Sequence, residues 1–187
     1  FQTSNRGILI FSLFFPLFFP LLSILGICLM NTTGNNIILI IMFISIPIYF
    51  GLLLGQSRRI PKITYPVTIW AISAALLFSR GLTSNYLVGG DIYTEYKSLQ
   101  IVLKNLCWSE LNFPSVVTSS LSSSLLPAIL QSLLGIDALH IYKVVFLILI
   151  STVPLIAYLI YQKFLEHLYA FLSVFFLMAQ IPFIYLL

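Results

Sequence analysis

The stretch 37-IILIIMFISIPIYFGLLLG-55 decides the fold class of this chain. It carries no charged side chain, and it is close to the roughly 20 residues that cross a bilayer as one helix. The rest of the sequence is similar, because 60% of the residues are hydrophobic and only 7% are charged. A soluble domain carries about 25% charged residues. The composition therefore places the chain among membrane proteins.

Apolar segments of spanning length lie on both sides of this stretch. Together they give five predicted spans, at about 7–30, 37–55, 63–82, 141–161 and 168–187. The first is too long for the apolar core of a signal peptide and no cleavage site follows it, so we interpret it as an anchored helix. We predict an all-α polytopic transmembrane helical bundle that forms a single domain. Because the sequence lacks an initiator Met and ends on the apolar run IPFIYLL, we expect it to be the N-terminal part of a longer protein.

The basic residues of the short loops indicate how these spans are oriented, since cytoplasmic loops carry an excess of Lys and Arg. The loop 55-GQSRRIPKIT-64 has three basic residues, whereas the loop 31-NTTGNN-36 has none. Arg6 before the first span and Lys163 between the last two agree with this pattern. We therefore predict a multi-pass protein of the cell membrane with a cytoplasmic N-terminus. The long loop 83–140 is then expected on the outer side.

This outer loop has helical patterns of its own. Leu99, Val102, Leu103, Leu106 and Trp108 recur near helical spacing, which predicts an amphipathic interfacial helix at about 91–111. An apolar helix at about 121–134 is too short to span and fits an interfacial or re-entrant segment. We expect Gly135 to end that helix, and Asp137 to stand at the N-cap of the fourth span.

The segment 89-GGDIYTE-95 opens the loop with two of the five acidic residues of the chain. Asp91 and Glu95 are four residues apart, so their carboxylates share one face if the segment is helical. Such a pair can bind a hard divalent cation, Mg²⁺ or Mn²⁺, through oxygen ligands. One carboxylate can instead act as a general base toward a hydroxyl group. The structural alternative is that Asp91 caps a helix while Glu95 pairs with Lys97 or is solvated.

Two cations lie at the outer ends of predicted spans, on either side of the acidic segment. Arg80 is near the end of the third span and Lys143 near the start of the fourth. At the level of the lipid headgroups, such side chains can bind a phosphate or pyrophosphate group. The alternative is snorkelling, in which a long basic side chain reaches the interface without a ligand.

Several classes of protein are excluded by what the sequence lacks. The net charge of +4 is small and scattered, so a nucleic-acid partner is not expected. There is no HExxH, CxxC or nucleophile elbow, and no glycine-rich phosphate loop before a strand. Metalloproteases, α/β-hydrolases and soluble nucleotide-binding folds are therefore excluded. Cys28 lies in an apolar run and is expected to be a buried, inert thiol.

Four segments resemble an archaeal-type family of polytopic membrane proteins of unknown function. They are LSILGICLMNTTGNNIILIIMF (22–43), GGDIYTEYKSLQIVLKNLCW (89–108), SSSLLPAILQSLLGI (122–136) and HIYKVVFLILISTVPLIAYLIYQKF (140–164). That family in turn resembles the GT-C glycosyltransferases, which take a sugar from a polyprenyl-phosphate donor. Those enzymes carry an acidic motif in the first large outer loop, and Asp91 occupies the matching place. Their motif is often Asp-x-Asp or Asp-Glu, whereas three residues separate Asp91 from Glu95, which favours a single base over a metal site.

The resemblance implies sugar transfer at the outer face of the membrane, from a polyprenyl-phosphate sugar to an acceptor that the sequence does not define. Asp91 would be the base, assisted by Glu95, while Lys143 and Arg80 would hold the phosphate of the lipid donor. Two other functions stay open. The chain could be a transporter or flippase-like protein for a lipid or small solute, or a non-catalytic subunit of a membrane complex. Transporters place polar residues at mid-membrane, and the predicted spans contain few such residues.

Overall fold

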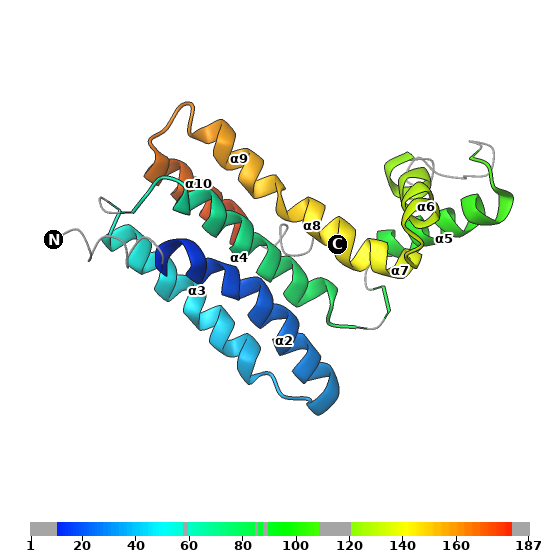
Figure 1. Cartoon of the computed structure of the whole chain (residues 1–187), viewed down its shortest axis with the longest axis horizontal. Helices are drawn as coiled ribbons and strands as arrows, with labels where there is room; N and C mark the ends of the chain where they lie inside the picture. The colour runs from blue at the N-terminus through cyan, green and yellow to red at the C-terminus, as the bar shows by residue number, and fades with distance from the viewer. Residues whose placement is uncertain (1–10, 58–59, 85, 88–89, 109–120, 181–187) are drawn as a thin grey trace. The chain divides into compact units, whose positions relative to one another are not determined.

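A computed structural model describes residues 11–57, 60–84, 86–87, 90–108 and 121–180 of the chain (Figure 1). The regular secondary structure of these residues is helical throughout, which confirms the all-α prediction. The longer helices are α2 (Phe18–Thr33), α3 (Ile37–Gly55), α4 (Thr64–Gly81), α5 (Gly90–Asn105), α6 (Leu121–Leu134) and α10 (His167–Met178).

Backbone contacts divide the chain into two compact units. Unit 1 comprises Phe1–Thr83 and Ile148–Leu186, and unit 2 comprises Ser84–Leu147. Unit 1 therefore contains α2, α3, α4 and α10, together with α9 (Val153–Tyr161). Unit 2 contains α5, α6 and the start of the helix that leads to α9.

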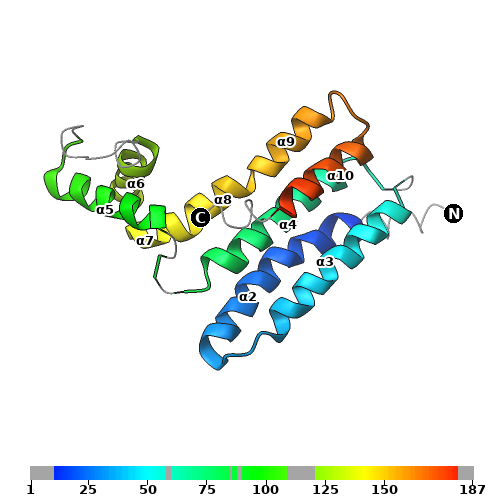
Figure 2. The same cartoon turned by 180° about the vertical axis from the view of Figure 1, so that it is seen from behind.

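Unit 1 is built around α4, which contacts α2, α9 and α10 (Figures 1 and 2). Side chains on every side of α4 are buried, among them Ile69, Ala71, Ile72, Ala74 and Ala75. Small residues allow the helices to approach closely, as is usual in membrane proteins. The hydroxyl of Ser23 on α2 donates a hydrogen bond of 2.9 Å to the carbonyl oxygen of Ala75.

Three helices in the described part of the chain are long and apolar enough to cross a membrane, namely Phe11–Thr33, Ile37–Gly55 and Ala138–Tyr161. They correspond to the spans predicted at 7–30, 37–55 and 141–161. Only 33%, 28% and 22% of their apolar windows are buried within the protein, so most of this apolar surface faces outward. Exposed apolar surface of that extent marks a membrane-interacting protein. The prediction of a membrane-associated chain is confirmed.

The helices at the other two predicted spans differ from these three. α4 is as long as a short span, but it is less apolar, and protein covers it on all sides. α10 is a shorter apolar helix that ends at Met178, and residues 181–187 of the predicted span 168–187 lie outside the described residues. Cys28 also departs from its prediction, since it is exposed on the outward face of α2.

Two prolines lie at irregularities in the helices. Pro16 lies in a 3₁₀ turn, Phe15–Leu17, immediately before α2. Pro154 lies in the first turn of α9, just after a turn at Thr152. Pro20 falls in the first turn of α2, where proline is tolerated, and does not end that helix.

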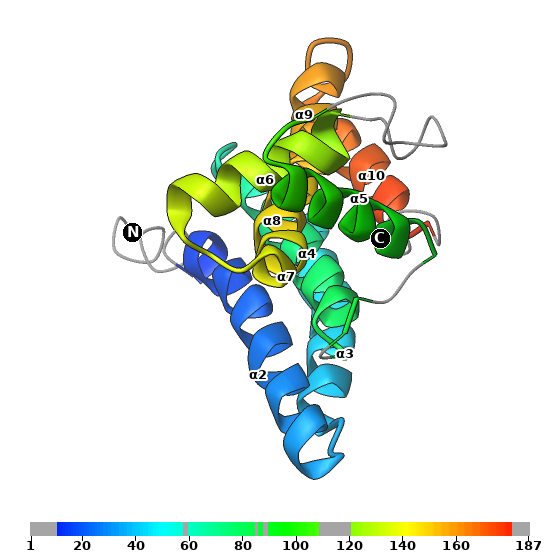
Figure 3. The same ribbon diagram turned by 90° about the vertical axis from the view of Figure 1, so that its right-hand side faces the viewer.

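Unit 2 has its own small core between α5 and α6, which lie against each other (Figure 3). Its buried residues are Leu99, Val102, Ala128, Ala138 and Tyr142. As predicted, Gly135 follows the end of α6, where it adopts a left-handed φ of 64° that favours glycine.

Asp137 also lies where the sequence predicts, at the N-cap of α7 (Ala138–His140). Its side chain makes no capping hydrogen bond. Instead, the Asp137 carboxylate lies 3.9 Å from Nδ1 of His140, one turn later.

Candidate functional site

The candidate site in unit 2 centres on Lys143, which lies in an unusual stretch of helix. After α7, residues Ile141–Val145 form a π-helical turn before α8 (Phe146–Ser151) continues the spanning helix. π-Helical turns inside α-helices are rare and frequently occur at functional sites. The additional residue in the turn changes the direction of the side chains that follow it. The one charged residue of this turn, Lys143, is therefore oriented by the π-helical geometry.

The side chain of Lys143 is buried, with 8% of its surface exposed. Its amine donates a hydrogen bond to the main-chain carbonyl oxygen of Ser84. A charged group within a membrane-spanning helix is costly and is usually retained for a function. An ammonium group has three N–H donors, so one bond to Ser84 leaves capacity for an anionic ligand.

Tyr142 is next to Lys143 in the chain, and its side chain is buried. It is 1% exposed and belongs to the core of unit 2. Its ring packs edge-on against Tyr96 of α5, with centroids 6.0 Å apart, and against Phe146, at 5.1 Å. The contact with Tyr96 joins the π-helical turn to α5.

Glu95 joins the same region from α5. Its side chain is half-buried, and its carboxylate is close enough to the hydroxyl of Tyr142 to interact with it electrostatically. Glu95 thereby interacts with a tyrosine that is distant from it in sequence and that precedes Lys143 in the chain. Both candidates, one acidic and one basic, belong to unit 2.

The structure says less about the other two candidates, Asp91 and Arg80. The backbone of Asp91 lies in the first turn of α5, and its side chain lies outside the described part of the structure. Arg80 is exposed in the last turn of α4, in unit 1. Its predicted role beside the other three stays a prediction.

The predicted metal site would consist of Asp91 and Glu95. Within the described residues, no group of three or more His, Cys, Asp or Glu side chains could hold a metal ion. A site built only on Asp91 and Glu95 would have two protein ligands, so its Mg²⁺ or Mn²⁺ would need oxygens from a substrate as well. The binding of such an ion to these two residues stays a prediction.

Unit 2 contains two kinds of ionisable group that can act on a phosphate ester. A carboxylate on α5 can accept a proton from a hydroxyl group. A buried ammonium on the π-helical turn can stabilise negative charge on a departing phosphate, most strongly where water is excluded. The buried Tyr142 can fix the position of the Glu95 carboxylate.

Tyr142 and Ser84 are the members of this site that sequence reasoning missed. A tyrosine near the end of an apolar span is typical of an interfacial anchor, so its residue type carries no distinctive signal. Ser84 contributes a main-chain oxygen, which any residue would provide. The position of Tyr142 beside the candidate Lys143 was the one available clue.

Comparison with known proteins identifies no relative of this chain. No family model, no curated protein and no solved structure matches it. The site is therefore interpreted from its own residues.

Proposed function

We propose that this chain is part of a membrane glycosyltransferase of the GT-C type, which transfers a sugar from a polyprenyl-phosphate donor at the outer face of the membrane. The observation that carries the proposal is the buried Lys143 on a π-helical turn, in the same unit as Glu95, whose carboxylate interacts with the neighbouring Tyr142. Ionisable groups are costly in an apolar core, and a ligand that carries charge would explain their presence there.

The proposed reaction uses groups on both sides of the donor. Asp91 accepts the proton of an acceptor hydroxyl, and the acceptor oxygen forms a bond to the anomeric carbon of the sugar. The bond from that carbon to the phosphate oxygen breaks, and the lipid phosphate departs with the bonding electrons. Lys143, with Arg80, stabilises the charge on that phosphate. Glu95 assists Asp91, either by orienting it or by sharing a divalent cation with it.

The proposal includes a fold and an orientation. Five spans, at 7–30, 37–55, 63–82, 141–161 and 168–187, would surround the site, with α5 and α6 at the outer membrane surface. The N-terminus would be cytoplasmic, because the basic loop at 55–64 would lie inside. Labelling of single cysteines placed at Gln56 and Lys97 tests this arrangement. An impermeant reagent should modify residue 97 and not residue 56 in intact cells.

One observation favours the alternative function of a transporter. The hydroxyls of Thr64 and Ser73 on α4 are buried and make no hydrogen bond within the described part of the structure. Unpaired buried polar groups in a bundle can line a path for a polar solute. This alternative predicts transport by the protein without formation of a new glycosidic bond.

The deciding experiment measures sugar transfer by the intact protein in membrane vesicles. Radiolabelled polyprenyl-phosphate sugars are supplied, and incorporation of label into acceptors is compared for the natural protein and Asp91→Asn. Loss of a general base lowers the rate by about 10²- to 10⁴-fold. Lys163→Gln, which alters an exposed lysine at the opposite end of the spanning helix, serves as the control and should leave the rate unchanged.

Two results would contradict the proposal. Transfer at the natural rate by Asp91→Asn would remove this residue from catalysis. Absence of transfer by well-folded natural protein with every donor supplied, together with uptake of a labelled solute, would favour the transporter.

A further inference from the structure

Unit 1 contains a group of buried polar residues that apolar packing does not explain. Thr64 and Thr68 lie on α4, Tyr49 lies on α3, and Ser12 lies in the helical segment just before Pro16. None of the first four is more than 4% exposed. Buried polar groups are nearly always hydrogen-bonded, so the partners of these residues indicate what the site holds.

Pro16 accounts for the contact between Tyr49 and the first spanning helix. A proline has no N–H, so Pro16 cannot donate the helical hydrogen bond to the carbonyl oxygen of Ser12, four residues earlier. The hydroxyl of Tyr49 instead donates a hydrogen bond of 2.6 Å to that oxygen. In membrane helices, neighbouring side chains and ordered waters satisfy the backbone groups that proline frees. The oxygen of the Tyr49 hydroxyl can still accept a hydrogen bond.

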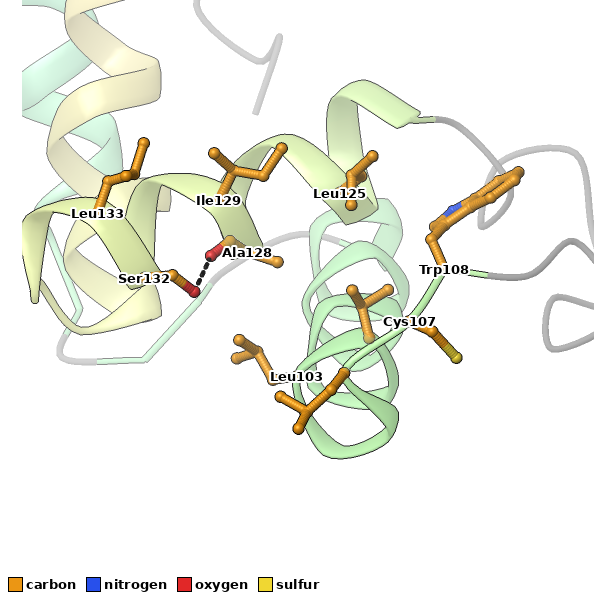
Figure 4. A pocket seen from close by; sticks show the side chains of 10 residues that line it. Leu103, Cys107, Trp108, Leu125, Ala128, Ile129, Ser132 and Leu133 are labelled. Carbon is orange, nitrogen blue, oxygen red and sulfur yellow. Dashed lines mark hydrogen bonds between the residues drawn. The ribbon is translucent and has the colours of Figure 1, made fainter.

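The hydroxyls of Thr64 and Thr68 lack the partner that helical hydroxyls usually find. Such a group can donate to a carbonyl oxygen one turn earlier in its own helix. Figure 4 shows this bond for Ser132 of α6, whose hydroxyl lies 2.9 Å from the carbonyl oxygen of Ala128, and Ser79 of α4 makes a bond of the same kind. The two threonine hydroxyls make no hydrogen bond within the part of the chain that the structure describes.

These unpaired hydroxyls and that of Tyr49 belong to one place in unit 1. Thr64 and Thr68 are four residues apart on α4, so they share one face of the helix. The hydroxyl of Thr68 is close enough to that of Tyr49 to interact with it electrostatically, although the two form no direct hydrogen bond. Polar groups that are near each other without a direct hydrogen bond are often bridged by water.

We propose that unit 1 binds one ordered water molecule between α3 and α4, on the hydroxyls of Thr64, Thr68 and Tyr49. The water would accept a hydrogen bond from each threonine and donate one to the oxygen of Tyr49. Three hydrogen bonds are the usual number for a buried water. A metal cation fits less well, because it would occupy the hydroxyl oxygens and leave their protons without acceptors.

The bound water would stabilise the first spanning helix at its irregular turn. It would hold the Tyr49 hydroxyl in the position from which it donates to the carbonyl oxygen of Ser12. α4 would thereby be connected, through the water and Tyr49, to the segment that Pro16 interrupts. This role concerns unit 1 alone and is independent of sugar transfer.

Oxidation by hydroxyl radicals tests for the water directly. X-ray pulses generate radicals from bound water as well as from solvent, so a buried side chain that touches a bound water is oxidised. The intact protein is irradiated in lipid nanodiscs, and mass spectrometry gives the oxidation rate of each residue. We expect Tyr49 to be oxidised at a severalfold higher rate than Phe171, which is also buried and packs against other aromatic rings.

Variants of the threonines connect this oxidation with the proposed ligands. Thr64→Val/Thr68→Val removes both hydroxyls at nearly constant shape, so the oxidation rate of Tyr49 should fall to about that of Phe171. The melting temperature should also fall, because the hydrogen bonds of the water are lost. In a site without water, removal of two unpaired hydroxyls would instead raise the melting temperature. Thr64→Ser/Thr68→Ser keeps both hydroxyls and should keep the oxidation of Tyr49.

Ser73→Ala is the matched control. The hydroxyl of Ser73 is also buried and unpaired within the described residues. Ser73 lies nine residues after Thr64 and five after Thr68, so it is turned by about 180° and 140° from them around the axis of α4. Its removal should leave the oxidation rate of Tyr49 unchanged.

Three results would overturn the site. Oxidation of Tyr49 as slow as that of Phe171 in the natural protein would show that no water is bound there. Unchanged oxidation of Tyr49 in Thr64→Val/Thr68→Val, or a higher melting temperature, would show that the threonines do not hold a water. A melting temperature that rises with sodium chloride and not with choline chloride, while Tyr49 stays unoxidised, would assign the site to a cation.

Discussion

The two units of this chain differ in whether their charged side chains are exposed or buried. In unit 1 every charged side chain that the structure describes is exposed, and these are Lys62, Arg80, Lys163 and Glu166. In unit 2 Lys143 is buried and Glu95 is half-buried, although this unit is the smaller of the two. Unit 1 has the character of a scaffold that depends on apolar packing. Unit 2 carries the ionisable groups that a folding requirement alone does not explain.

The difference has a physical basis in what surrounds each unit's key helix. α4 is buried on all sides, so its contacts are with other helices and it can use alanine and serine at close approaches. The π-helical turn of unit 2 instead places a long cationic side chain next to a single carbonyl oxygen. Burying a charge with few partners costs stability. If the comparison is right, substitutions in unit 1 should change stability and substitutions in unit 2 should change activity.

The largest expected effect is on the stability of unit 1. Phe171 on α10 is fully buried, and its ring lies 5.2 Å from that of Tyr65 and 5.5 Å from that of Phe50. Phe171→Ala should lower the free energy of unfolding by about 3–5 kcal/mol. Phe176 on the same helix is 71% exposed, so Phe176→Ala serves as a matched control with little effect. Unfolding in detergent, followed by circular dichroism, measures both.

The next effect is on activity in unit 2. Lys143→Met replaces the buried ammonium by an apolar side chain of similar length. We expect sugar transfer to fall by about 10²-fold, the usual consequence of removing one stabilising donor. The free energy of unfolding should change by less than about 1 kcal/mol, because apolar replacement of a buried charge is often neutral.

The exposed Lys163 provides the control for this substitution, since Lys163→Met should change neither quantity. A loss of stability in Lys143→Met comparable to that of Phe171→Ala would break the comparison. Lys143 would then be a structural residue of unit 2.

How far the sequence predicts this structure depends on which contacts create each feature. The helix at 37–55 follows from the apolar run alone, and α3 begins and ends at those residues. Gly135 and Asp137 are found at their predicted helix ends because turn conformations depend mainly on local residue type. The π-helical turn at Ile141–Val145 has no such local signal, since packing of Tyr142 against Tyr96 and Phe146 accompanies it.

The candidate site also has parts that the sequence predicts and parts that depend on contacts between distant residues. Glu95 and Lys143 are conspicuous in an apolar sequence, so they could be proposed from residue type alone. The interaction of Glu95 with Tyr142 depends on how α5 packs against the spanning helix, and that contact joins residues about fifty positions apart. The hydrogen bond from Lys143 to the carbonyl oxygen of Ser84 likewise has no signature in the sequence.

A smaller effect tests close packing within unit 1. A Cβ atom added to Gly26 on α2 would lie 2.8 Å from a methyl carbon of Leu39 and 3.2 Å from its backbone nitrogen. Gly26→Ala should therefore cost about 1–3 kcal/mol of stability through overpacking. Gly51 on α3 has open space around it, so Gly51→Ala should stabilise the helix by roughly 0.5–1 kcal/mol. Equal effects of the two substitutions in thermal unfolding would mean that α2 and α3 do not approach closely.

The smallest expected effect comes from removing one tyrosine hydroxyl in each unit. Tyr158 and Tyr142 are equally buried, at 1% exposed. In unit 1 the hydroxyl of Tyr158 forms a hydrogen bond of 3.0 Å with Nδ1 of His167, so Tyr158→Phe should cost about 1 kcal/mol of stability and leave sugar transfer unchanged. In unit 2 the hydroxyl of Tyr142 lies near Glu95, so Tyr142→Phe should lower transfer severalfold by releasing the carboxylate.

Measuring both quantities for both variants separates a positioning role from a purely structural one. A positioning role for Tyr142 requires that the loss of transfer exceed what its change in stability predicts. Tyr158→Phe should show no such excess loss of transfer. An equal excess loss in Tyr158→Phe, or its absence in Tyr142→Phe, would show that Tyr142 does not position Glu95.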